Sequence, residues 1–215
     1  MSALYEESHR ELQRRFDTER LADRIEQRLF RTALTDEDRA FIERLDLFFL
    51  ATVNSRGEPN CSYKGGDLGF VRVLDAKTLA FPCYDGNGMY LSMGNVAANR
   101  NVGLLFIDLC SPKRLRVNGT ARIAPLEVVS PRFAEAQFVV VVNVREVFPN
   151  CPRYIHKFAL VERSQFVPHE GVTTPIPGWK QMDWARDVLP HNDPATQAGM
   201  PAVEQCMEQL PRSES

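Results

Sequence analysis

The stretch RLRVNGT at residues 114–120 alternates cationic or amide side chains with apolar ones. Successive side chains of a β-strand point to opposite faces, so Arg114, Arg116 and Asn118 share one face while Leu115 and Val117 face a core. Two guanidinium groups two residues apart on a rigid strand suit a phosphate, because each keeps its charge and presents paired planar donors. The alternation predicts a strand with a ligand-binding face; the alternative is a solvated strand face.

Strand-like segments joined by short turns surround this stretch. The predicted hairpins pair Leu47–Val53 with Asn60–Lys64, Phe70–Leu74 with Thr78–Pro82, and Gly103–Asp108 with Arg114–Ile123. Three successive hairpins with almost no helix between them predict a six-stranded antiparallel sheet that closes into a small barrel and so removes its edges. Further along the chain we expect a helical segment near Leu126–Ala136, a buried valine-rich strand at Phe138–Val144 and a last strand at Lys157–Val161.

Helical patterns are confined to the N-terminal part and to one glycine-containing stretch. Residues 4–30 carry apolar residues at spacings of four among dense charge, which predicts an amphipathic arm. Thr35, followed by three acidic residues, predicts the start of a short helix that ends near Leu45. The stretch from Asp85 to Arg100 reads as a loop that opens a helix, with Asp85 or Asn87 as its cap.

Composition excludes several classes of protein. The chain has 215 residues with 26 Lys and Arg against 28 Asp and Glu, a formal net charge of -2, which argues against a nucleic-acid or anionic-membrane partner. Its five cysteines form no C-x-x-C pair, and its four histidines show no ligand spacing, so we expect neither a disulfide framework nor a metal site. Reduced thiols, no signal peptide and no uncharged span near ~18 residues predict a cytoplasmic protein without a membrane segment.

The glycine-containing loop is a candidate anion site. The free amides and positive dipole end of a helix that starts at Asn87 would attract a phosphate, and Gly86 and Gly88 would let it approach the backbone. The loop matches neither a nucleotide P-loop nor a dinucleotide-binding turn. The alternative is a tight glycine turn that binds nothing.

Three segments together carry a family resemblance. These are ATVNSRGEPNCSYKGG at residues 51–66, NVGLLFID at residues 101–108 and RLRVNGT at residues 114–120. In this order they resemble the flavin-binding split-barrel family that includes pyridoxamine 5'-phosphate oxidase, over roughly Leu34 to Val167. The resemblance implies a mainly β fold with peripheral helices, an antiparallel six-stranded split β-barrel. We therefore expect an N-terminal helical arm at 1–33, an FMN-binding domain at 34–168 and a C-terminal arm and tail at 169–215.

The resemblance also implies a set of cofactor-binding residues. Lys64 corresponds to a basic position that points to the flavin or its phosphate, and Phe81-Pro82 to backbone that lines the ring system. Arg153 lies in NCPRYI, an element found near the flavin in such relatives. Asn87-Gly88-Met89 departs from the oxidase itself, which carries basic residues there, so phosphate binding shifts toward the two arginines of the 114–120 stretch. The expected FMN-binding residues are Ser62, Lys64, Phe81, Pro82, Asn87, Gly88, Met89, Asn95, Arg114, Arg116 and Arg153.

The implied function is that of an FMN-dependent oxidoreductase, a homodimer with flavin at the subunit interface that acts on an unidentified small molecule. No catalytic residue is identified, and Cys151 lacks a recognisable base. Activity on pyridoxamine phosphate is expected to be low, because the chain ends in Pro211-Arg212-Ser213-Glu214-Ser215 without the arginine-rich ending of true oxidases. The alternatives are a flavin carrier or sensor without turnover, or a relative that uses a deazaflavin or haem on the same barrel.

Overall fold

The computed structural model describes residues 2 and 4–197 and divides into two compact units, Met1–Glu162 and Arg163–Ser215. The strands of the sheet all belong to the first unit, together with helices α1 to α4. Within the described part of the second unit the chain forms only short helical turns. No helix among the described residues has both the length and the apolar character needed to cross a membrane.

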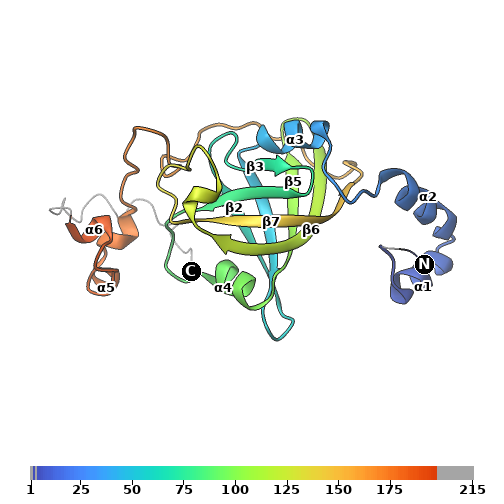
Figure 1. Ribbon diagram of the computed structural model, residues 1–215, viewed down its shortest axis with the longest axis horizontal. Helices are drawn as coiled ribbons and strands as arrows, with labels where there is room; N and C mark the ends of the chain where they lie inside the picture. The colour runs from blue at the N-terminus through green and yellow to red at the C-terminus, as the bar shows by residue number, and fades with distance from the viewer. Residues whose placement is uncertain (1, 3, 198–215) are drawn as a thin grey trace, which may run out of the picture. The chain divides into compact units, whose positions relative to one another are not determined.

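The first unit is built around one antiparallel sheet in the order β2-β1-β5-β6-β7-β4-β3 (Figure 1). Its strands are β1 Leu47–Val53, β2 Pro59–Gly65, β3 Arg72–Asp75, β4 Thr78–Cys83, β5 Asn101–Asp108, β6 Lys113–Ala124 and β7 Phe138–Pro149. The three expected hairpins, β1–β2, β3–β4 and β5–β6, are confirmed, as is the mainly antiparallel fold. The expected six-stranded closed barrel is corrected to seven strands, with no pairing between the terminal strands β2 and β3 in the described residues.

Strand β7 accounts for the difference in strand number. It runs for 12 residues, longer than expected, and pairs with both β6 and β4. Strand β7 therefore joins the β5–β6 hairpin to the β3–β4 hairpin in one sheet. The last strand expected at 157–161 is wrong. That segment has no strand structure, and its apolar side chains Phe158, Leu160 and Val161 are exposed, so strand-like composition alone did not bring it into the sheet.

The valine run of β7 is continuous because both of its faces are covered. Val140 and Val142 belong to the main core, in which Phe48 of β1 lies 5.0 Å from Phe81 and 5.3 Å from Phe106 between ring centroids. Val139 and Val141 belong to a smaller cluster on the other face. A strand buried on both faces loses the polar alternation of a half-exposed strand.

The segment between β6 and β7 covers this second face without forming the expected helix. Only a 3₁₀ turn, η1 Leu126–Val128, is present, and the chain beyond it packs Val129 and Phe133 on the sheet. The helix expected at 126–136 is therefore wrong. Pro131 has no amide hydrogen to donate to a helical hydrogen bond. The apolar residues of this segment are instead buried by packing on the sheet in an irregular conformation.

Helix α3 Asp36–Glu43 confirms its predicted start. The Thr35 hydroxyl accepts from the Asp38 amide at 3.2 Å, and the Asp38 carboxylate accepts from the Thr35 amide at 2.9 Å. This reciprocal capping leaves fewer unpaired amides in the first turn. Phe41 and Ile42 of this helix enter the main core.

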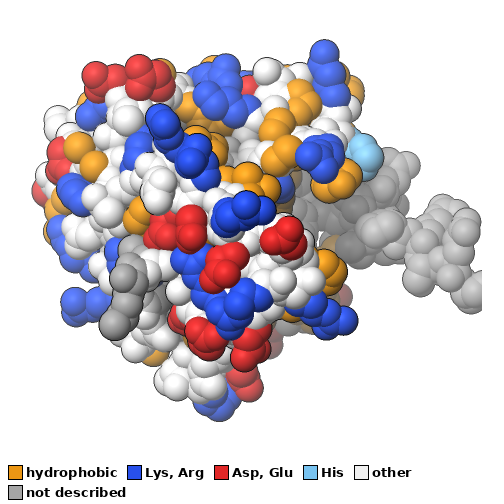
Figure 2. Space-filling view, turned by 90° about the vertical axis from the view of Figure 1, so that its right-hand side faces the viewer, with side chains coloured by type: hydrophobic (Ala, Val, Ile, Leu, Met, Phe, Trp, Pro, Cys, Tyr) orange, Lys and Arg blue, Asp and Glu red, His pale blue; other side chains and the backbone are white. Residues whose placement is uncertain are grey.

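The expected N-terminal arm forms two helices, α1 Glu7–Arg15 and α2 Glu19–Leu29, interrupted where Asp17 has a positive φ of 53°. Ion pairs link the two helices; for example, Arg10 Nη1 lies 2.7 Å from Asp23 Oδ1. On the face of the molecule in Figure 2, positive and negative side chains are interspersed rather than gathered by sign. Within the arm, both helices carry acidic and basic residues.

The second unit contains η2 Gly178–Gln181, α5 Asp183–Arg186 and α6 Pro194–Gln197. Its buried centre is an ion pair in which Lys180 Nζ lies 2.6 Å from Asp193 Oδ2. The Trp179 and Trp184 rings stack beside it with centroids 6.0 Å apart. The expected C-terminal tail is described only as far as α6, which ends at Gln197, and the rest of it lies outside the described residues.

Candidate functional site

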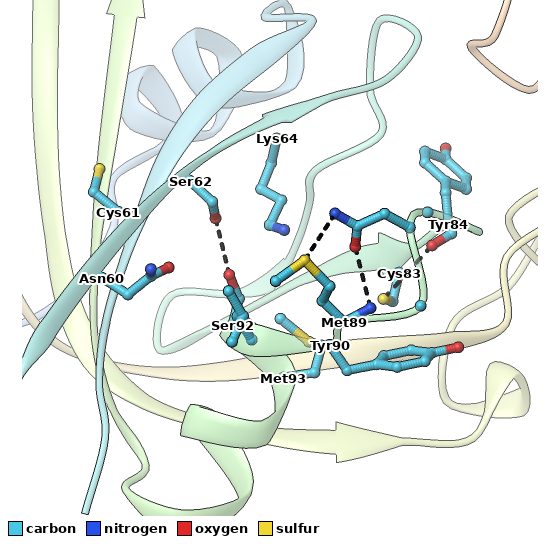
Figure 3. A pocket seen from close by; sticks show the side chains of 14 residues that line it. Asn60, Cys61, Ser62, Lys64, Cys83, Tyr84, Met89, Tyr90, Ser92 and Met93 are labelled. Carbon is cyan, nitrogen blue, oxygen red and sulfur yellow. Dashed lines mark hydrogen bonds between the residues drawn. The ribbon is translucent and has the colours of Figure 1, made fainter. Parts of the chain in front are cut away.

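A cavity of about 350 Å³ opens between the edge strand β2, the end of β4 and the start of α4 Leu91–Ala98 (Figure 3). Its volume lies within the range of small-molecule sites. The lining residues are Asn60, Cys61, Ser62, Lys64, Cys83, Tyr84, Gly86, Asn87, Gly88, Met89, Tyr90, Leu91, Ser92 and Met93. The cavity is thus made by two chain segments that are separate in sequence, residues 60–64 and 83–93.

The loop from Gly86 to Tyr90 forms one wall. The Asn87 side-chain oxygen accepts from the Met89 amide at 3.1 Å, which folds the loop back on itself. Gly88 has a φ of +73°, a conformation that costs other residues energy. Tyr90 also has a positive φ, 48°, and the helix begins only after it. The expected helix start at Asn87 is corrected to Leu91, and neither Asp85 nor Asn87 caps it.

The first turn of α4 lies at the cavity. The first amides of an α-helix have no partner within the helix, and the positive end of its dipole lies there. Ser92, in this turn, is hydrogen-bonded through its hydroxyl to that of Ser62 on β2, at 3.0 Å. Backbone amides and two hydroxyls therefore stand close together, a donor set that suits an anion.

Lys64 supplies a cation to the same cavity from β2. Its side chain is half-buried, and this burial lowers its pKa below the usual 10.5; only the charged thiolate form of the nearby Cys83 would act in the opposite direction. Burial also raises the pKa of Cys83, so this thiol stays neutral at pH 7 and gives Lys64 no counter-charge. An anionic ligand in the cavity would act against this effect of burial and raise the pKa of Lys64.

The arginines of β6 do not line this cavity. Arg114 donates to the Cys151 carbonyl at 2.7 Å, while its buried Nε has no hydrogen-bond partner among the described residues. Arg116 is exposed, 6.0 Å above the Phe148 ring. Arg153 lies 5.9 Å from the Tyr154 ring. Within one chain, the predicted phosphate-binding residues therefore separate into a cavity group and an arginine group.

The residues predicted to bind the cofactor differ in where they lie. Five of them line the cavity: Ser62, Lys64, Asn87, Gly88 and Met89. Phe81 is 1% exposed in the main core, and Pro82 is buried on β4. Asn95 lies on α4 and donates to Thr52 Oγ1 at 3.1 Å.

Sequence reasoning missed eight residues of the cavity lining: Asn60, Cys61, Cys83, Tyr84, Tyr90, Leu91, Ser92 and Met93. Cys83 and Tyr84 directly follow a predicted strand, and the cavity forms where that strand ends. Burial raises the pKa of Tyr84 to about 12, so its phenol stays a neutral hydrogen-bond donor. Ser92 could have been found as a polar residue in a first helical turn only with the helix start placed correctly.

Three comparisons relate the chain to known proteins, and one of them, with family models, identifies a family. The family model described as pyridoxamine 5'-phosphate oxidase matches residues 34–150. Solved structures similar to this chain include HupZ from Group A Streptococcus, with 23% identity, 54% of this chain and 93% of that chain covered, and a TM-score of 0.43. An FMN-binding protein from Syntrophomonas wolfei has 11% identity, coverages of 65% and 97%, and a TM-score of 0.39. The heme storage protein HutZ from Vibrio cholerae has 18% identity, coverages of 54% and 93%, and a TM-score of 0.39. A search of curated proteins found no match.

Proposed function

The chain belongs to the pyridoxamine 5'-phosphate oxidase family, and on this premise we propose that it is an FMN-binding flavoprotein that acts as an oxidoreductase on a small molecule. The observation that carries the proposal is the convergence of the first turn of α4, the Gly86–Tyr90 loop and Lys64 on one cavity. These groups supply amide donors, close backbone approach and a cation. They fit a ligand that carries both a phosphate and a polar ring.

The phosphate is assigned to the first turn of α4. Unpaired amides and the dipole of that turn favour negative charge. Gly88 leaves the adjoining loop without a side chain, and even a Cβ at this position would have no neighbouring atom within 4 Å, so the backbone is open to a ligand. The Ser62 and Ser92 hydroxyls stand beside it and can reorient to donate. This arrangement replaces the basic residues that the oxidase carries at the Asn87–Met89 positions.

Lys64 is assigned to the polar edge of the ring system. Bound FMN would supply the electron-accepting chemistry, which the side chains of the cavity do not have. An ammonium group held in a half-buried place favours a ligand that gains negative charge. Such chemistry needs no general base, in keeping with a cavity whose described lining contains no histidine or carboxylate side chain.

A second copy of the chain is proposed to complete the site. The described lining contains one cationic side chain, Lys64, whereas an FMN phosphate carries up to two negative charges. Arg114 and Arg116 form a fork of fixed positive charge that does not reach the cavity of their own chain. In a homodimer with FMN at the interface, this strand would meet the partner's cavity.

The visible absorption spectrum of the purified protein during titration with FMN tests the proposal. We expect saturable binding with perturbed flavin bands, followed by bleaching when NADH or NADPH is added anaerobically. Bound flavin that stays oxidised with both nicotinamides would overturn the oxidoreductase part and leave a carrier. Failure to take up FMN would overturn the flavin assignment, and deazaflavin and haem would then be titrated in the same way.

Complementation between two variants tests the composite site. Lys64→Met and Arg114→Ala homodimers should each bind FMN weakly, because each lacks one cation at both sites. After the two variants are unfolded and refolded together, mixed dimers would contain one intact site and one doubly defective site. We expect partial recovery of tight binding in the mixture; no recovery, with mixed dimers verified by mass spectrometry, would contradict an interface site.

A further inference from the structure

Thr52 is a polar residue in an otherwise apolar strand. Strand β1 reads LFFLATV, and its inward-facing positions are Phe48, Leu50 and Thr52, each 0% exposed. A buried hydroxyl costs free energy unless it is hydrogen-bonded, and valine would fill nearly the same volume without that cost. The hydroxyl therefore needs a reason beyond packing, and its partner is Asn95 of α4, whose side-chain amide donates to it at 3.1 Å.

Two hydrogen bonds attach α4 to two adjacent strands. Ser92 bonds Ser62 on β2 at 3.0 Å, and Asn95 bonds Thr52 on β1. Residues three apart lie on the same side of a helix, so both bonds leave from the face that packs on the sheet. In the strand register, Thr52 lies opposite Asn60, two residues from Ser62. The pair of bonds consequently fixes both the height and the rotation of α4 against the sheet.

The helix itself has little local stabilisation. It is eight residues long, Gly94 lies in its middle, and its N-cap Tyr90 makes no side-chain capping bond. Short helices are marginal in water, and an internal glycine weakens them further. Apart from the apolar contacts of Met93 and Val96, α4 depends on its two polar bonds to the sheet.

We propose that Thr52 and Asn95 are positioning residues that hold the first turn of α4 at the cavity, in the orientation needed to bind the phosphate of the ligand. The Asn95 side chain thus has a structural partner, although sequence reasoning assigned it to the cofactor. Neither residue lines the cavity, so their effect on binding passes through the helix. This inference rests on the proposed function for its ligand, but not for its effect on the helix.

A conservative pair of variants tests the inference through binding. Thr52→Val keeps the volume and removes the acceptor, which leaves the half-buried Asn95 amide without this partner; we expect FMN to bind about tenfold more weakly. Thr52→Ser keeps the hydroxyl and should bind within about twofold of the wild type. Ile42→Val in α3 is the matched control, because it removes a buried methylene elsewhere in the core and should lower stability without changing FMN affinity.

Hydrogen–deuterium exchange of the ligand-free protein provides a test that needs no flavin. In Thr52→Val, the peptide covering residues 91–98 should exchange faster, while one covering 138–149 is unchanged; Thr52→Ser should match the wild type. Wild-type affinity and unchanged exchange in Thr52→Val would overturn the inference. If the wild type fails to bind FMN, the flavin proposal fails, and the exchange result alone then decides whether Thr52 positions α4.

Discussion

The cavity and the strand β6 offer an anion two different kinds of binding group. At the cavity, the donors are helix amides, two hydroxyls and Lys64, whose pKa is lowered by burial. On β6, the donors are the guanidinium groups of Arg114 and Arg116, which present paired planar donors and fixed positive charge. Arginines on one strand are visible in sequence, whereas a cavity built from loop and helix backbone is not. A ligand that uses both regions would be held by shape on one side and by fixed charge on the other.

The largest expected effect is at β6. Arg114→Ala or Arg116→Ala should each weaken FMN binding by about 1.5–3 kcal/mol, because each removes one charge-assisted contact with the phosphate. Fluorescence titration with FMN measures the loss. Arg122→Ala, an exposed arginine on the same strand, is the matched control and should leave the affinity unchanged. Unchanged affinity in both test variants would remove β6 from the site.

The next effect is at the cavity. Lys64→Met should weaken FMN binding by about 1.5 kcal/mol, less than the arginine variants, because an ammonium group lacks the paired planar donors with which a guanidinium group binds a phosphate. Isothermal titration calorimetry at pH 7 gives the value. Lys77→Met, in the turn between β3 and β4, serves as the control for loss of a lysine outside the cavity. A larger loss for Lys64→Met than for the β6 variants would reverse the ranking of the two regions.

The pH dependence of FMN affinity separates the two regions by chemistry. Lys64 attracts the ligand only as the ammonium, and burial places its pKa in the free protein below 10.5. Affinity should therefore fall as the pH rises through this lowered pKa, up to the loss seen for Lys64→Met. Lys64→Arg keeps its charge at these pH values and should flatten the profile. Equal pH profiles for the wild type and Lys64→Arg would show that Lys64 does not face the ligand.

The smallest expected effect concerns the loop. Gly88→Ala should lower the free energy of unfolding by about 1 kcal/mol, because a side chain at a φ of +73° is strained. Gly86→Ala is a close control, since a Cβ at either glycine meets nothing within 4 Å and only Gly88 has a positive φ. Urea denaturation measures both. Equal changes in the free energy of unfolding for the two substitutions would mean that the positive φ at Gly88 is not what constrains this loop.

The sequence correctly predicted the elements that depend on residues close together in the chain. The capping box at Thr35 and Asp38, the three hairpins and the alternating strand at 114–120 all report contacts between neighbouring residues or across short turns. The predictions failed where apolar composition was the only signal for an element. Residues 157–161 have the composition of a strand, yet the sheet has no place for them, and residues 126–136 have apolar residues that lie along β7 instead of forming a helix.

For the site, the sequence by itself determined the chemical inventory: an arginine strand, a glycine-containing loop before a helix, and Lys64 on a strand that follows a turn. Only the tertiary structure decided which of these meet. It brought Lys64, the loop and the first turn of α4 to one cavity, left Arg114 and Arg116 outside it, and gave Thr52 its partner Asn95. The physical reason is that side-chain alternation and turn chemistry act over a few residues, whereas a cavity is enclosed by segments far apart in the chain that pack together only when the core forms.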